Sequence, residues 1–106
     1  MVLRLWSART TAAQAPAYAR YLEGHVFPEL RGIDGYLGAR LLERSAAGAI
    51  EILVITEWQA LESIRRFSGD DLEHAVVTDE AAKLLTDFDR RVRHFDVVVT
   101  DRVADR

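Results

Sequence analysis

The chain has 106 residues, of which 49% are hydrophobic and 29% charged, and a formal net charge of −3. This length and composition favour one folded domain over a disordered chain. The absence of cysteine excludes disulfides, a thiol nucleophile and cysteine-ligated metals, and the small negative charge argues against a dedicated binder of nucleic acid. We expect a single domain over residues 1–106, with a core at about 2–100 and a polar tail at 101–106.

The sequence contains neither a targeting signal nor a membrane span that we can identify. Met1–Trp6 is interrupted by Arg4 and is too short for the apolar region of a signal peptide. The longest apolar run, Ala49–Ile55, contains Glu51 and is far from the roughly 18 residues that a membrane span needs. These features predict a cytoplasmic protein with no membrane association.

The first half of the chain predicts a strand followed by a helix. Val2–Arg9 mixes β-branched and aromatic residues with leucine, which favours a strand. Capping-box spacing begins at Thr11, and Pro28 is expected to end the helix near Val26, with a turn at Gly32–Gly35. The apolar residues that recur with helical spacing are Tyr18, Tyr21, Leu22, His25 and Val26.

Three more strands are predicted in the second half. Tyr36–Arg44 and Ala49–Trp58 are expected to pair as a hairpin through a loop at Ser45–Gly48. The last strand is expected at Arg91–Thr100, which ends in three consecutive valines.

Short helices are predicted between the hairpin and the last strand. One covers about Ala60–Phe67, a further helical turn runs through His74, and another helix lies within Asp79–Phe88. The complete order is βαββαβ, which predicts the α+β class and a ferredoxin-like fold with a four-stranded antiparallel sheet.

Apolar residues on both faces of the predicted strands point to a homodimer. Ile52 and Val54 face one way, Leu53 and Ile55 face the other, and Val97–Val99 are apolar on both sides. The helices of this fold cover only one face of the sheet, so the second apolar face needs another cover. We predict that a second copy of the chain packs sheet against sheet.

Several short segments along the chain together fit the sequence pattern of one protein family. They are Arg4-x-Trp6, Tyr18-x-x-Tyr21-Leu22 with Pro28, Gly35-x-x-Gly38, Leu53–Trp58, Phe67–Val76 and His94–Val97. Over about residues 2–100 they resemble the antibiotic biosynthesis monooxygenase family, which has the dimeric α+β barrel fold. The resemblance implies homodimers whose two sheets form a shared barrel, with a pocket between each sheet and its own helices. It also implies oxidation of aromatic polyketides or quinols by dioxygen without a prosthetic group.

A related branch of the family degrades haem, and this chain departs from its pattern. Both that branch and the polyketide-oxidising members rely on a pocket asparagine, whereas this chain contains no asparagine. In the haem branch the Asn falls near Ser7, the Trp falls on Phe67 and the His falls near Val77 of this chain. The nearest histidine here, His74, lies three residues before Val77. Haem degradation is therefore a distant third hypothesis.

The three histidines, His25, His74 and His94, lack metal-ligand spacing, so we expect no metal and no cofactor. His94 lies on the inward side of the last strand and is the predicted catalytic base, because imidazole titrates near neutral pH. His25 and Tyr21 would assist it. The alternative is a structural histidine that is bonded to a backbone carbonyl.

Aromatic and polar residues near the predicted pocket form the candidate substrate-binding set. Large rings can stack on a planar substrate, although core packing explains them equally well. The set is Trp6, Trp58, Phe67, Tyr18, Tyr36, Arg40 and His74. For the acidic run Asp70–Glu73 we expect carboxylates at the start of a helix rather than a calcium site.

The leading hypothesis is a homodimeric cofactor-independent monooxygenase that acts on a planar phenol, quinol or anthrone. The alternative is a non-catalytic homodimer that binds a small hydrophobic metabolite. An open pocket would favour the enzyme, and a pocket filled by Tyr18, Tyr21 and Trp58 would favour the alternative.

Overall fold

Three long strands form most of one antiparallel sheet in the computed structural model, which describes residues 1–104. They are β1 (Val2–Thr10), β2 (Tyr36–Ala46) and β3 (Ala49–Trp58). β1 pairs with β3 along its whole length, and β2 pairs with β3 through a tight turn. The turn is only Ala47–Gly48, where both residues have positive φ as a two-residue hairpin requires. The predicted strands are confirmed, and the predicted four-residue loop is two residues too long.

The fourth strand is broken into β4 (Asp87–Phe88) and β5 (Arg93–Asp96), both antiparallel to β1. The prediction of one continuous strand at Arg91–Thr100 is therefore wrong. Residues 90–92 turn away from β1 because they bond to the loop at 73–75 instead. In that loop the Ala75 amide donates to the Arg90 carbonyl at 3.1 Å, while the Val92 amide donates to the Glu73 carbonyl at 2.9 Å.

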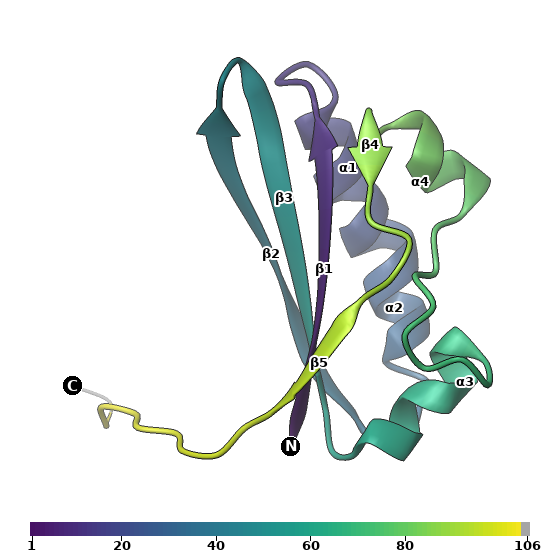
Figure 1. Cartoon of the computed structure of the whole chain (residues 1–106), viewed down its shortest axis with the longest axis vertical. Helices are drawn as coiled ribbons and strands as arrows, with labels where there is room; N and C mark the ends of the chain where they lie inside the picture. The colour runs from purple at the N-terminus through teal and green to yellow at the C-terminus, as the bar shows by residue number, and fades with distance from the viewer. Residues whose placement is uncertain (105–106) are drawn as a thin grey trace.

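The three valines Val97–Val99 also lie outside the sheet. The Val97 amide still donates to the Met1 carbonyl, and β5 ends at Asp96. Val98 is 89% exposed, and Figure 1 shows this segment running away from the rest of the fold.

A continuous helical segment follows β1 and comprises α1 (Ala15–Tyr21), the π-helix η1 (Leu22–Val26) and α2 (Phe27–Leu30). The prediction that Pro28 ends the helix near Val26 is wrong, because the helix continues to Leu30. Pro28 lies in the first turn of α2, directly after the wider π-turn, where its missing N–H is tolerated.

The second helical region consists of the 3₁₀ helix η2 (Leu61–Ile64), α3 (Arg65–Ser68) and α4 (Asp79–Lys83). The predicted helical turn through His74 is absent, since residues 70–78 contain no helix. No helix among residues 1–104 is long and apolar enough to cross a membrane.

All helices cover the same face of the sheet, as Figure 1 shows. The sheet order β2-β3-β1-β4, with β5 also on β1, is the predicted ferredoxin-like arrangement. We call the helix-covered side the inner face and the opposite side the outer face. The inner face contributes Val2, Ala8, Ile52 and Trp58 to the core, and it also carries the site described next.

Candidate functional site

A cavity of about 120 Å³ lies between the inner face of the sheet and the helical layer. β1 and β3 supply its floor, the α1–η1–α2 segment supplies one wall, and residues 76–78 and α4 supply another. Most of the lining is apolar. The polar and aromatic residues of the lining are Arg4, Trp6, Tyr18, Tyr21, His25, Phe27, Glu29, Thr56, Phe67 and Thr78.

Two tyrosines from α1 line the cavity in different ways. Tyr18 is only 2% exposed, and burial raises the pKa of its phenol. The Tyr18 hydroxyl makes no hydrogen bond within the described chain, yet no fully enclosed side-chain oxygen there lacks a partner, so this hydroxyl opens onto the cavity. The Tyr21 hydroxyl is instead 2.7 Å from the Thr78 hydroxyl. Tyr18 therefore offers a free polar group to a ligand.

The π-helix η1 shapes the rim of the cavity. It places Leu22, His25 and Val26 along the lining, and wider π-turns of this kind are often found at functional sites. The His25 ring is exposed and packs against Tyr21, with ring centroids 5.3 Å apart. Among the three histidines, His25 alone contributes to the cavity lining.

Arg4 places a buried guanidinium on the cavity floor. The residue is 4% exposed, and burial lowers its pKa to about 10, so it remains protonated at neutral pH. Nη1 donates to the Leu72 carbonyl and Nη2 to the His74 carbonyl, both at 2.6 Å. The guanidinium also lies over the Phe67 ring, 5.4 Å from the ring centroid.

His94 lies beside Arg4 rather than on the cavity. Its Nε2 is 3.0 Å from Nη1 of Arg4, and because arginine only donates, Nε2 must accept and the ring is neutral. Burial and, secondly, the Arg4 charge lower the pKa of His94, while Glu73 opposes them. His94 thus faces inward as predicted but contacts the cavity only through Arg4.

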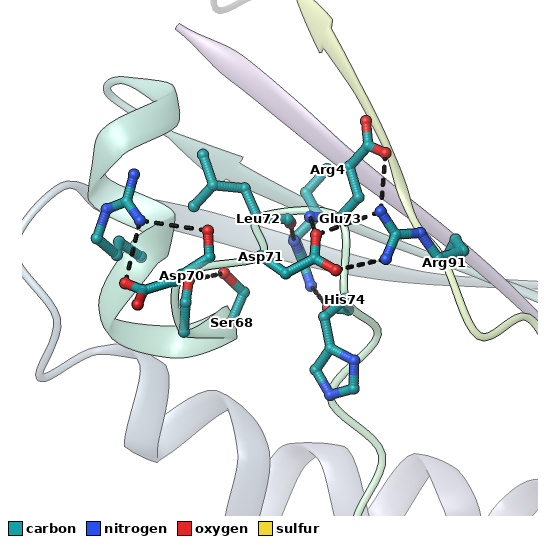
Figure 2. Close-up of polar contacts among 10 residues, drawn as sticks. Arg4, Ser68, Asp70, Asp71, Leu72, Glu73, His74 and Arg91 are labelled. Carbon is teal, nitrogen blue, oxygen red and sulfur yellow. Dashed lines mark hydrogen bonds and ion pairs between the residues drawn. The ribbon is translucent and has the colours of Figure 1, made fainter.

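The loop at 70–74, which contains the two carbonyls that accept from Arg4, is also held by ion pairs, as Figure 2 shows. Arg91 pairs with Asp71 and Glu73, and Arg65 pairs with Asp70. Arg91 lowers the pKa of Asp71, chiefly through a direct side-chain hydrogen bond. The expectation that these acids begin a helix is wrong, since the loop is held by pairing with arginine instead.

The candidate stacking residues divide between cavity and core. Trp6 and Phe67 line the cavity, and the Trp6 indole donates to the Asp89 carbonyl at 2.6 Å. Trp58 is fully buried, bonds to the Thr56 hydroxyl, and packs on Phe67 with centroids 6.3 Å apart. Trp58 therefore supports the cavity from behind and does not reach a ligand.

Three other predicted site residues lie away from the cavity. Tyr36 packs edge-on against Trp58 and lines a separate surface depression. Arg40 pairs with Ile55, which places it on the outer face. The His74 backbone carbonyl contacts Arg4, but Figure 2 shows its ring turned away from that guanidinium. The register of β2 against β3 places Arg40 on the outer face. His74 is placed by its pairing with Arg91, which lies in the break between β4 and β5.

Sequence reasoning missed Arg4, Thr56 and Thr78 as lining residues. A signal for Arg4 was present, since it alternates with Val2 and Trp6 on one side of β1 and therefore points toward the helices. A charged residue at an inward position is rare unless it has a partner or a function. Thr56 and Thr78 carry no comparable signal.

No group of three or more His, Cys, Asp or Glu side chains within residues 1–104 is arranged to hold a metal ion. The Asp71–Glu73 carboxylates are already paired with Arg91.

Solved structures of similar shape cover nearly the whole chain. One is a Bacillus cereus protein assigned to the antibiotic biosynthesis monooxygenases, with a TM-score of 0.71, 11% identity, and coverage of 99% of this chain and 98% of that one. A Deinococcus radiodurans protein with the same assignment has a TM-score of 0.62, 18% identity, and coverage of 99% and 100%. A third is the monooxygenase from the gene ActVA-Orf6 of Streptomyces coelicolor in complex with nanaomycin D, with a TM-score of 0.59, 13% identity, and coverage of 99% and 92%.

A scan against protein-family models finds no match, and a search of curated proteins finds none either. The structural matches nevertheless confirm the predicted resemblance at the level of fold. The chain has the α+β, ferredoxin-like fold of the antibiotic biosynthesis monooxygenase structures.

Proposed function

We propose that this protein is a cofactor-independent monooxygenase that oxidises a planar phenol, quinol or anthrone-type compound with dioxygen. The observation that carries the proposal is the cavity, which combines aromatic walls with the Tyr18 hydroxyl and the Arg4 guanidinium. The Streptomyces protein of the same fold holds the ligand nanaomycin D, which supports an aromatic ligand here.

The reaction needs a proton acceptor and a dry site. The substrate hydroxyl loses a proton, and the resulting anion passes an electron to dioxygen, after which a carbon–oxygen bond forms on the ring. The oxygen–oxygen bond then breaks as the ring carbon loses its hydrogen. One oxygen atom becomes a quinone carbonyl, and the other leaves as water with the two hydrogens that the phenol has lost.

His25 is the group best placed to take the first proton, because it lines the cavity and is open to solvent. Tyr21 positions the His25 ring by packing against it. His94 acts in this proposal by accepting a hydrogen bond from Arg4, which holds the guanidinium in place. Trp6 and Phe67 position the substrate ring and exclude water.

Oxygen uptake with methylhydroquinone or a model anthrone tests the activity. His25→Gln should lower the enzyme-dependent rate by about 10²-fold or more, as is typical for loss of a general base. His74→Gln is the matched control, since that ring does not line the cavity, and it should keep the wild-type rate. Equal rates in both variants would remove His25 from the mechanism.

A non-catalytic binding protein for a small hydrophobic metabolite is the second candidate. The observation that favours it is that the chain contains no asparagine, on which the polyketide-oxidising members of the family it resembles rely. Tight binding of these compounds without oxygen uptake would establish this alternative.

We also propose a homodimer that forms through the outer face. The strand registers place apolar side chains from four strands on this face, where no helix covers them. They are Leu3, Leu5, Leu42, Leu53, Ile55 and Phe95. Uncovered apolar side chains of this kind, with charged residues such as Arg40 and Arg44 on the same face, are typical of an interface.

Two leucines of equal exposure provide a matched test of the dimer. Leu42 on the outer face and Leu61 in η2 are each 43% exposed. Leu42→Glu should raise the dimer dissociation constant by about tenfold or more in sedimentation experiments, because it places a charge in an apolar contact. Leu61→Glu should leave it unchanged. A wild-type chain that sediments as a monomer at high concentration would contradict the proposal.

A further inference from the structure

The charge of Arg4 has no counter-ion among residues 1–104. Ion pairs among residues 1–104 involve Arg9, Arg44, Arg65 and Arg91, and none involves Arg4. Its partners are two backbone carbonyls and the neutral His94 ring. Buried charges are normally paired, because desolvation of an unpaired ion is costly. A guanidinium that is 4% exposed and lines a cavity is therefore ready to receive an anion.

Arg4 also has donors to spare. A guanidinium has five N–H groups, and the three contacts above use three of them. Nε–H and the second N–H of Nη2 make no hydrogen bond with the described residues. Since no fully enclosed side-chain nitrogen there lacks a partner, Nε is accessible from the cavity. This geometry leaves hydrogen-bond donors for one oxyanion.

The size and lining of the cavity restrict the rest of the ligand. A volume of about 120 Å³ is close to the roughly 150 Å³ of a known apolar cavity that binds benzene, and well below the roughly 300 Å³ or more of common ligand pockets. Phe67 and Trp6 supply aromatic surface beside Arg4. Among the described residues, Glu29 is the only carboxylate of the lining and is exposed, and Arg4 is the only arginine or lysine of the lining. The site suits one ring and one negative charge.

We propose that the cavity binds a single-ring aromatic monoanion, with its oxyanion on Arg4 and its ring against Phe67 and Trp6. This proposal rests on the proposed function only in using the same cavity as the ligand site. The phenolate is also the form of substrate that the proposed oxidation consumes. Of the proposed substrates, a cavity of this size favours phenols and quinols with one ring over anthrones.

The visible ionisation of 4-nitrophenol provides the test. We expect wild-type protein at saturating concentration to lower the apparent pKa of the bound phenol by about one unit, which equals a tenfold preference for the anion. 4-Nitrotoluene, of similar shape but without charge, should bind about tenfold more weakly than the phenolate. Benzoate should compete with 4-nitrophenol, since it carries the same charge on one ring.

Variants then assign the effect to Arg4. Arg4→Met should abolish the shift, Arg4→Lys should retain part of it, and the matched Arg20→Met, which removes an exposed charge from α1, should retain all of it. The titration is repeated in His94→Gln, because the His94 ring accepts a hydrogen bond from Arg4 and its own pKa responds to the charges of Arg4 and Glu73.

Several results would overturn the proposal. A bound phenol whose pKa rises, or 4-nitrotoluene binding as tightly as the phenolate, would show that Arg4 serves only to hold the loop at 72–74. Both results come from the wild-type protein, so they decide the matter even if Arg4→Met does not fold. The titration is made without oxygen, so a protein that takes up no oxygen can still show the pKa shift of the bound phenol. A protein that oxidises its substrate but does not shift this pKa would contradict the anion site on Arg4 and leave the proposed oxidation standing.

Discussion

The two faces of the same sheet differ in what their side chains contact. On the inner face, Val2, Arg4 and Trp6 alternate along β1 against the helices, and they include both core and cavity residues. On the outer face, Leu3 and Leu5 alternate with them but meet no helix. The inner face combines apolar packing with an inward charge, whereas the outer face carries apolar residues that no described helix covers, together with charged residues such as Arg40.

This difference shows how one strand can serve two purposes. A strand presents alternate residues to opposite sides, so each side can follow its own requirement. The inner side requires close packing, except where Arg4, Tyr18 and Thr56 surround a space that can hold a ligand. On the outer side, apolar residues such as Leu3, Leu5 and Leu53 are covered by no helix among residues 1–104.

The adjacent residues Ile52 and Leu53 give the strongest test of the contrast. Ile52 is fully buried on the inner face and Leu53 is half-buried on the outer face. Ile52→Ala should lower the free energy of unfolding by about 3 kcal/mol, because it leaves a cavity in the core. Leu53→Ala should cost about 1 kcal/mol when measured under conditions where the chain is monomeric. Similar losses in urea unfolding would contradict the contrast.

The turn before β2 should be sensitive to a single methyl group. Gly35 has φ of 93°, and a Cβ there would lie 2.3 Å from the Ser63 hydroxyl. Gly35→Ala should therefore destabilise the fold by about 2 kcal/mol. Gly32→Ala is the control, since its nearest atom is 3.5 Å away. Replacing Ser63 by Gly in the Gly35→Ala background should recover part of the loss, and a failure to recover any would leave backbone strain as the whole cause.

The helical cover of the inner face depends on a cap at α4. The Thr78 side chain accepts a hydrogen bond from the Ala81 amide, and it also contacts the Tyr21 hydroxyl. Thr78→Ala should cost about 1 kcal/mol in thermal or urea unfolding, as for other N-caps. Thr78→Ser keeps the hydroxyl and should remain near wild type. An equal loss in the serine variant would point to the methyl group instead.

The smallest predicted effect is the pH dependence that His94 introduces. Its folded-state pKa lies below the ordinary value of 6.5, so the unfolded chain binds the proton more readily. Stability should therefore fall as the pH drops through about 6.5 toward the folded-state pKa. His94→Gln should lose this component in urea unfolding between pH 8 and pH 5. An unchanged slope in the variant would assign the pH dependence to other groups.

Local patterns along the chain predicted much of the fold. The β-branched and aromatic residues of β1 and the turn residues of the hairpin predicted β1, β2 and β3 within a residue or two of their observed bounds. The helical stripe of Tyr18, Tyr21 and His25 lies along one wall of the cavity. Errors arose where distant segments compete, as at residues 90–92, which bond to the loop at 73–75 instead of continuing along β1.

The sequence by itself determined the order of the elements, the two apolar faces and the residue types available for chemistry, because these follow from local spacing. Only the tertiary structure decided which of those residues share a cavity. It placed Trp58 in the core, Arg40 on the outer face and His94 behind Arg4. It also brought Arg4 to the carbonyls of Leu72 and His74. Such contacts depend on strand register and on the path of a distant loop, which no local spacing encodes.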